Sequence, residues 1–148
     1  MRLVTIPKEK LKKYTVDKEM LQKADRPCAL VLRLKFRGRR YDFAVPLRSN
    51  INPSTPKNEY FALPPRHTTK PNHRHGIHYA KMFPIDKRIA TKFNINNNIY
   101  YGTIKAILDK NEKSIINECQ DYLNRYEANG KPKYSTDLDL LLKIMQAK

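Results

Sequence analysis

Residues 28–47 read CALVLRLKFRGRRYDFAVPL, and apolar side chains alternate with polar ones through both halves of this stretch. Every second residue from Leu30 to Phe36 is apolar, which places these side chains on one face of an extended chain. Gly38 lies between the two halves, and the alternation resumes from Tyr41 to Val45. The pattern predicts a β-hairpin over residues 28–47.

Proline dominates the segment that follows this hairpin. Pro46 is expected to end the second strand because proline lacks a backbone donor, and seven of the ten prolines fall within residues 46–84. The segment is therefore predicted to be mostly loop. Two short apolar runs, Tyr60–Leu63 and Ile77–Phe83, are expected to return to the sheet, the second ending at Pro84.

Helical patterns lie at both ends of the chain. Residues 8–23 predict a short, basic, amphipathic helix or a pair of turns, and Thr103–Glu127 carries the apolar spacing of one long core helix. The run Ser135-Thr136-Asp137 resembles an N-cap before a last helix over Leu138–Met145. The predicted architecture is a single α+β domain, residues 1–148, with a small twisted antiparallel sheet or partly open barrel packed with helices.

Positive charge is concentrated in the first two thirds of the chain. The formal net charge is +16, and residues 1–92 hold 22 Lys and Arg against 7 Asp and Glu, whereas residues 93–148 hold 8 against 7. Phosphate contacts by Lys and Arg release counterions, so a surface of this density is typical of nucleic-acid-binding proteins. The alternatives are charge that serves solubility or attraction to anionic lipid.

The two cysteines indicate a reducing compartment. Cys28 and Cys119 are far apart and form no Cys-x-x-Cys motif, so neither a zinc framework nor a disulfide scaffold is implied. The apolar stretch before Pro7 is too short for a signal peptide, and no apolar run approaches the length of a membrane span. We therefore expect a cytoplasmic protein without a membrane partner.

Several classes of catalytic site are excluded by what the chain lacks. It has no Gly-rich phosphate loop, and the acidic residues of its basic half are scattered singly, which makes a two-metal nuclease site improbable. His73, His75 and His78 lie close in sequence, but Arg74 and other nearby cations oppose a bound metal ion. The expectation is a site with no metal and no cofactor.

RNA can be cleaved without a metal because it carries its own nucleophile, the 2′-hydroxyl. Cleavage then needs a base, donors that stabilise the charged phosphorane, and an acid for the leaving 5′-oxygen. Histidine, arginine, lysine, serine and tyrosine supply these functions near neutral pH. The candidate catalytic residues are Ser49, His78, Arg48, Lys57 and Tyr14.

The remaining basic residues of this region are candidates for RNA contact. Five cations close together on the hairpin repel one another unless an anion bridges them, although a solvated strand face is the plain alternative. The predicted RNA-binding residues are Arg33, Lys35, Arg37, Arg39, Arg40, Arg66, Lys70, Arg74 and Lys81.

Two motifs carry a resemblance to a known family. Residues 40–49 read RYDFAVPLRS, and residues 74–85 read RHGIHYAKMFPI. Together with the preceding strand over Cys28–Phe36 they resemble the ToxN/AbiQ family of type III toxin–antitoxin toxins, and the proline-rich loop and His-Gly-Ile-His-Tyr segment look closest to the TenpN or CptN branches. The motifs cover roughly residues 1–90.

The resemblance implies a metal-independent, sequence-specific endoribonuclease on a fold similar to the Kid/MazF toxins. It implies that cellular mRNA is cut to 2′,3′-cyclic phosphate and 5′-hydroxyl ends, in a system associated with phage defence. It further implies inhibition by a small antitoxin RNA, typically a pseudoknot, which the toxin trims from a repeat precursor and holds in a closed toxin–RNA assembly.

The resemblance also assigns residues. Ser49 matches the serine that the family uses after its Pro-Leu dipeptide, whereas Arg48 replaces a common threonine and Ile51 stands where a lysine is expected. Lys57, six residues further along, or Arg48 would then supply the cation. His78 occupies a position where some relatives have asparagine.

Each assignment has a structural alternative. Ser49 also fits a turn, His78 a hydrogen-bonded structural histidine, Lys57 a solvated loop, and Tyr14 the core or a base-stacking position. For the whole chain, the alternative function is a non-enzymatic RNA-binding protein, such as a ribosome-associated one. A DNA-binding regulator is a third hypothesis, for which no helix-turn-helix signature is visible.

Overall fold

The computed structural model describes residues 1–20, 28–95 and 98–147. Within them the chain forms an α+β fold, an open antiparallel sheet of seven strands with four α-helices. The strands are β1 (Leu3–Thr5), β2 (Cys28–Phe36), β3 (Arg39–Ile51), β4 (Tyr60–Leu63), β5 (Arg74–His78), β6 (Phe83–Ile85) and β7 (Thr91–Lys92). The helices are α1 (Lys8–Leu11), α2 (Ile99–Lys110), α3 (Glu112–Asn129) and α4 (Leu138–Gln146). Single 3₁₀ turns are η1 (Lys12–Val16), η2 (Lys57–Glu59), η3 (Tyr79–Lys81) and η4 (Lys87–Ile89).

The predicted hairpin is confirmed and forms the centre of the sheet. Strand order is β4-β5-β3-β2-β1-β7, and β6 pairs separately with β3. The β2–β3 register ends at the pair Phe36 and Arg39, so the turn consists of Arg37 and Gly38, which have φ angles of 51° and 81°. Two left-handed residues match the twist of a tight hairpin.

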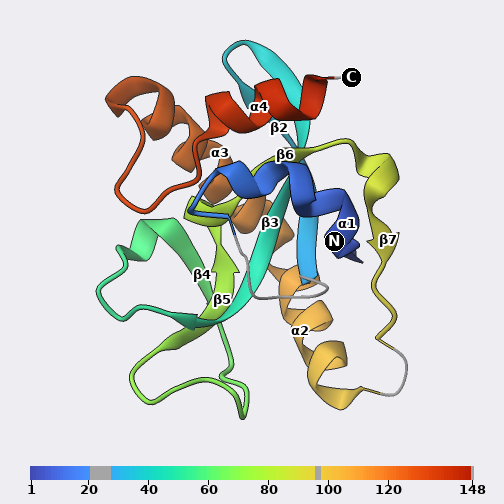
Figure 1. Ribbon diagram of the computed structural model, residues 1–148. Coiled ribbons are helices and arrows are strands. Elements are labelled where there is room, and N and C mark those ends of the chain that lie inside the picture. The colour runs from blue at the N-terminus through green and yellow to red at the C-terminus, as the bar shows by residue number, and fades with distance from the viewer. Residues whose placement is uncertain (21–27, 96–97, 148) are drawn as a thin grey trace.

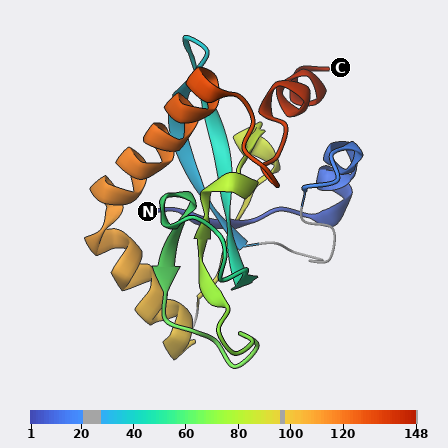
Figure 2. The same ribbon diagram turned by 90° about the vertical axis from the view of Figure 1, so that its left-hand side faces the viewer.

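Helices cover both faces of the sheet, as Figures 1 and 2 show. On one face α2 and α3 pack Leu108 and Tyr122 onto the large core that includes Phe36. On the other face α1, η1 and α4 enclose a second core, in which Tyr14 contacts Phe83 with ring centroids 5.5 Å apart. The predicted α+β fold, an antiparallel sheet packed with helices, is therefore confirmed, and the sheet is open.

Two predicted strand ends are wrong. The strand β3 continues through Pro46 to Ile51 because it changes its neighbour at that point: residues 42–44 pair with β6, and Leu47 pairs with β5. Pro46 lies between the β6 ladder and the β5 ladder, so its missing backbone N–H removes a hydrogen bond from neither of them. Pro84 likewise lies inside the short strand β6, opposite Phe43, instead of ending it.

The single long helix predicted over Thr103–Glu127 is also wrong, since two helices meet at Asn111. The Asn111 side chain donates a hydrogen bond of 2.8 Å to the carbonyl of Ile107, and its φ and ψ of −108° and 15° leave the helical region. Asparagine satisfies the exposed carbonyls at a helix end, so the chain turns there and starts α3.

The terminal predictions are largely confirmed. The basic segment predicted over residues 8–23 forms α1 and η1, while residues 21–23 lie outside the described part of the chain. Asp137 caps α4, its side chain accepting a hydrogen bond from the backbone N–H of Leu140 at 3.1 Å. Among the described residues, no helix is both long enough and apolar enough to cross a bilayer.

Gly76 allows β4 and β5 to approach each other closely. A Cβ atom at this position would lie 2.2 Å from the carbonyl oxygen of Phe61, a contact that only a backbone shift could relieve. We expect Gly76→Ala to lower the free energy of unfolding by about 1–3 kcal/mol, the usual cost of overpacking. Urea denaturation measures this loss, and unchanged stability would contradict the close approach.

Candidate active site

The extension of β3 beyond Pro46 brings Arg48 to the end of β5. Arg48 is the cross-strand partner of Gly76, and His78 ends β5 two residues later. The Arg48 Nη1 and His78 Nδ1 atoms are 3.4 Å apart. The structure therefore brings two of the candidate residues together, and their contact depends on the strand continuing past the proline.

His78 is held as a neutral imidazole. It is 5% exposed, and burial, together with the charges of Arg48 and Lys81, lowers its pKa to about 3. Burial also lowers the pKa of Arg48, but a guanidinium stays charged at any ordinary pH. Because Arg48 can only donate, Nδ1 of His78 accepts and Nε2 carries the proton. The pair thus offers a fixed cation and an N–H donor.

Acid stability should report this environment directly. In the unfolded state His78 binds a proton below pH 6.5, its ordinary pKa. In the folded state it binds one only near pH 3, because its pKa is lowered to about 3. We expect the free energy of unfolding to fall by about 1 kcal/mol or more per pH unit as the pH drops from 6 to 4. Urea titrations should show a shallower fall for His78→Gln, and equal slopes would contradict the buried neutral state.

Arg48 and His78 lie in a cavity of about 570 Å³, here called the Arg48 cavity. Four segments distant in sequence form its wall, and they contribute both charges and amides. The cations and imidazoles are Arg48, His73, His78, Lys81 and Lys133. The carboxylates and amides are Glu19, Glu59, Asn50 and Asn52. The cavity is thus mainly cationic but has two carboxylates.

The two carboxylates have different surroundings. Lys81 Nζ donates to Glu19 Oε2 at 2.7 Å and to the backbone carbonyl of Tyr134 at 2.6 Å, which joins three segments of the wall. Glu59 forms no hydrogen bond or ion pair through its side chain with any described residue. Burial raises the pKa of Glu59, against the opposing charges of Arg125 and Lys81.

The other predicted catalytic residues do not line the Arg48 cavity. Ser49 is half-buried and follows Arg48 on β3, where successive side chains point to opposite faces. Lys57 is exposed on η2, beside the loop that forms the rim. Tyr14 lies in the second core with no exposed surface, so the core alternative describes its position.

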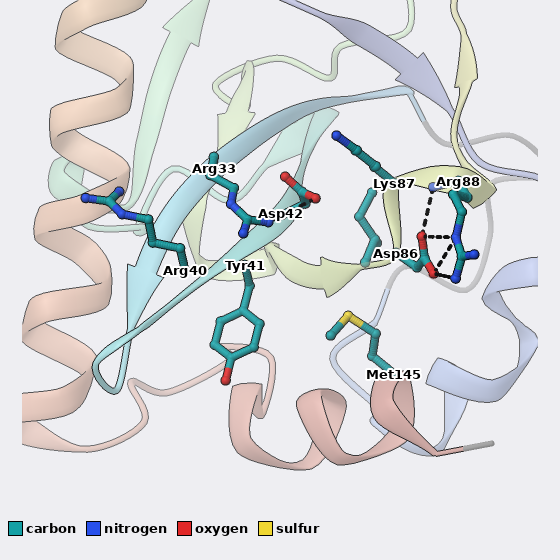
Figure 3. A pocket seen from close by; sticks show the side chains of 9 residues that line it. Arg33, Arg40, Tyr41, Asp42, Asp86, Lys87, Arg88 and Met145 are labelled. Carbon is teal, nitrogen blue, oxygen red and sulfur yellow. Dashed lines mark hydrogen bonds and ion pairs between the residues drawn. The ribbon is translucent and has the colours of Figure 1, made fainter.

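Two of the predicted RNA-binding residues help to form a second concavity, here called the hairpin pocket. Its volume is about 360 Å³, and its cations are Arg33, Arg40, Lys87 and Arg88. Figure 3 shows Arg33 beside Asp42 on the sheet, across from the ion pair of Asp86 and Arg88. Exposed ion pairs of this kind are weak, so the arginines remain available to an incoming phosphate.

The hairpin tip uses its cations differently. Arg37 forms a two-point ion pair with Asp139 of α4, at 2.7 and 2.9 Å, and its backbone N–H donates to Glu127. Lys35 and Arg39 are exposed, and the backbone of Lys35 is bonded to the Gln120 side chain of α3. The tip is thus anchored to two helices, and Arg37 is engaged within the protein.

The predicted RNA-binding residues after the hairpin are dispersed. Arg66 stacks over the rings of Tyr100 and Tyr101. Lys70 is exposed on the loop between β4 and β5, and Arg74 is exposed at the start of β5. Lys81 is buried in the wall of the Arg48 cavity instead of facing solvent.

The three neighbouring histidines point to different surroundings. His75 contacts the carbonyl of Pro64 and the hydroxyl of Tyr100, while His73 and His78 line the Arg48 cavity. Among the described residues, no group of three or more His, Cys, Asp or Glu side chains is placed to hold a metal ion.

Sequence reasoning missed several residues of the cavity wall. Asn50 and Asn52 follow Arg48 with the spacing of a strand face, which is a signal that the sequence does contain. Glu19 and Glu59 had no such signal, because isolated acids in basic segments form no motif. Lys133 reaches the cavity only through the tertiary fold, from the loop between α3 and α4.

Comparisons with known proteins give matches by structure alone. No family model matches the sequence, and no curated protein matches it. One solved structure, from work on a processed non-coding RNA that regulates a bacterial antiviral system, has a TM-score of 0.69 at 18% identity and covers 97% of this chain and 96% of its own. A second, from work on bacterial type III toxin–antitoxin systems with selective toxin inhibition by a non-coding RNA pseudoknot, has a TM-score of 0.74 at 16% identity. That match covers 98% of this chain and 95% of the other.

A third similar structure is AbiQ, a lactococcal anti-phage endoribonuclease of a type III toxin–antitoxin system. It has a TM-score of 0.69 at 16% identity and covers 96% of this chain and 93% of its own. The structural neighbours are ToxN/AbiQ proteins, as the sequence motifs indicated. At these identities the similarity establishes the fold, and the chain matches that fold over nearly its whole length.

Proposed function

We propose that this chain is the endoribonuclease toxin of a type III toxin–antitoxin system and that it cleaves RNA without a metal. The observation that carries the proposal is the Arg48–His78 pair, which lies in a cationic cavity of a fold shared with ToxN/AbiQ proteins. An arginine donor supplies the charge stabilisation and an imidazole supplies the acid that cleavage needs when a phosphodiester has its own nucleophile, and solvent takes the 2′-proton.

The proposed reaction is an internal displacement at phosphorus. The 2′-oxygen of the ribose bonds to the adjacent phosphorus while its proton passes to a solvent water, and the bond from phosphorus to the 5′-oxygen breaks. The 5′-oxygen takes up a proton. The products are a 2′,3′-cyclic phosphate and a 5′-hydroxyl, with no net consumption of water.

Arg48 and His78 divide the work in this step. The Arg48 guanidinium stabilises the charge that develops on the phosphorane oxygens. In the complex the Arg48 guanidinium turns from Nδ1 of His78 to the phosphate, so Nδ1 takes up a proton from solvent and the resulting imidazolium donates from Nε2. A bound phosphate adds negative charge beside the imidazole and offsets Arg48 and Lys81, which raises the pKa of His78 in the complex. His78 then transfers a proton to the leaving 5′-oxygen.

Roles for Ser49, Lys57 and Tyr14 stay predictions. Ser49 adjoins Arg48 in the chain but points to the opposite face of β3, so its proposed role in orienting a substrate oxygen requires β3 to rearrange when RNA binds. Lys57 is placed to meet RNA at the rim. We assign Tyr14 to the core.

The proposed partners are cellular mRNA as substrate and a small structured antitoxin RNA as inhibitor, held in a closed toxin–RNA assembly. The positions of the two basic concavities on β3 favour an extended RNA ligand. Asp42 lines the hairpin pocket and Arg48 the Arg48 cavity, six residues further along the same strand. This spacing corresponds to about 20 Å, so one RNA chain could contact both.

The hairpin pocket should contribute to RNA binding through phosphate contacts. We expect the double variant Arg33→Ala and Arg40→Ala to weaken antitoxin RNA binding for all sequences alike, and to reduce the slope of log K against log salt by about 2. Titrations at several salt concentrations measure this slope. Arg2→Ala is the control, because it removes an exposed arginine that lies in neither concavity. An unchanged slope in the double variant would show that RNA bypasses this pocket.

The proposed function is tested by incubating the purified protein with RNA in EDTA and analysing the ends of the products. We expect cleavage, with 2′,3′-cyclic phosphate and 5′-hydroxyl ends. Products with 3′-hydroxyl ends would refute the mechanism, and intact RNA would favour a non-enzymatic RNA-binding protein.

A further inference from the structure

We propose that the Arg48 cavity contains a nucleobase subsite, formed by the ring of Tyr134 and the carboxylate of Glu59, that selects guanine beside the cleaved phosphate. The inference rests on the proposed function, because it assumes an RNA substrate. It adds a recognition role for two residues that lie outside the Arg48–His78 pair.

Glu59 is the first component of the subsite. It is the carboxylate of the cavity wall that no described side chain satisfies, in contrast to Glu19, which is bonded to Lys81. Its backbone is held firmly, since its N–H donates to Pro56 at 3.0 Å and Arg125 of α3 donates to the carbonyl of Asn58 at 2.9 Å. A carboxylate on a backbone held in this way, with no partner of its own among the described side chains and among cations that attract RNA, fits a ligand with two donors.

Tyr134 is the second component. Its φ of 65° is left-handed, a conformation unfavourable for a bulky residue, and Lys81 holds its carbonyl there. The side chain nevertheless stays 63% exposed while it lines the cavity, with Lys133 Nζ 5.1 Å from the ring centroid. An exposed ring kept in place at a cationic cavity is the surface on which unpaired RNA bases stack.

The chemistry of the carboxylate determines which base fits. Two carboxylate oxygens accept two parallel hydrogen bonds, and guanine presents N1–H and N2–H₂ side by side on its Watson–Crick edge. Adenine and cytosine each place a ring-nitrogen acceptor next to their amino group, and uracil flanks its one donor with two carbonyls, so all three would set an acceptor against a carboxylate oxygen. Ionised Glu59 therefore favours guanine over the other three bases.

Replacing the carboxylate by an amide should change the preferred base. Glutamine has one acceptor and one donor, which match the amino group and N1 of adenine. We expect the wild-type protein to cut a randomised RNA pool with guanine at one fixed position next to the cut, favoured by about 10- to 100-fold. Glu59→Gln should move the preference away from guanine to adenine and cytosine, which share this arrangement of an amino group beside a ring nitrogen. A merely structural role would lower the rate without moving the preference.

Two controls complete the experiment. Inosine at the selected position keeps N1–H but lacks the amino group, so the wild-type protein should cut it about tenfold more slowly than guanine. Tyr134→Ala should lower kcat/KM by about tenfold or more through lost stacking, whereas Tyr134→Phe should retain it.

The possible outcomes separate the two proposals. A wild-type protein that cleaves no RNA would overturn the proposed function itself. Cleavage without a guanine preference, or with a preference that Glu59→Gln leaves unmoved, would overturn the subsite while leaving the proposed function intact. Equal cleavage by Tyr134→Ala would remove the stacking surface from the proposal.

Discussion

Replacing Arg48 by alanine is expected to lower the rate constant of RNA cleavage by about 100- to 1000-fold, the usual cost of removing one preorganised donor from a charged transition state. Arg48 is half-buried, and its guanidinium lies 3.4 Å from the His78 ring. The charge is therefore held before substrate arrives, and no other described side chain is bonded to Nδ1 of His78.

Single-turnover cleavage at saturating protein measures this loss separately from any loss of RNA affinity. Arg48→Lys keeps the charge but not the planar fork, so we expect an intermediate rate. Arg2→Ala controls for the removal of one positive charge. Thermal unfolding should first show that both proteins are folded. Equal rates for Arg48→Ala and the wild-type protein would then place the reaction elsewhere.

The second large effect is expected from His78→Gln. Glutamine retains a hydrogen-bond donor of similar length but cannot transfer a proton, so cleavage should fall by about 100- to 10,000-fold. His67→Gln, which changes an exposed histidine of the long loop, should cleave as the wild-type protein does.

The His78 variant is best measured with a substrate whose 5′-leaving group is activated, such as a nitrophenyl phosphodiester of a ribonucleoside. A good leaving group needs no acid, so the loss should shrink sharply for that substrate if His78 protonates the 5′-oxygen. An equal loss with both substrates would assign His78 to another role.

The central hairpin was predictable from sequence because one face of β2 is buried over its whole length. Every second residue from Leu30 to Phe36 is apolar and buried on that face, and a slip of one residue would turn all of them to the other face. The end of the hairpin was not predictable in the same way. Pro46 stops a strand only where its missing donor breaks a ladder, and the change of partner at that position depends on β5, some 30 residues later.

Asn111 illustrates a second limit. The apolar spacing of α2 and α3 is compatible with one helix, and the break becomes visible only when the side-chain bond from Asn111 to Ile107 is known. Local patterns report which face of an element is buried. They do not report where one helix ends and the next begins.

The candidate site was also predictable only in part, because a sequence motif does not show which side chains the fold brings together. Arg48 and His78 were found because they lie within motifs and have suitable chemistry, but the same reasoning selected Tyr14, whose ring fills the second core. Lys81 was assigned to an RNA-binding surface, yet its ammonium joins Glu19 to the loop before α4. Such assignments depend on contacts across more than 50 residues of chain.

The most direct test of the whole account is a single 2′-deoxy substitution at the nucleotide whose 3′-phosphate is cut. If the reaction uses the substrate's own hydroxyl, an RNA oligonucleotide with this one change should bind with nearly unchanged affinity and remain intact at that bond, while neighbouring sites are still cut. Cleavage of the substituted bond at the rate of the all-ribose control would show that water or a protein side chain is the nucleophile, and would contradict the account.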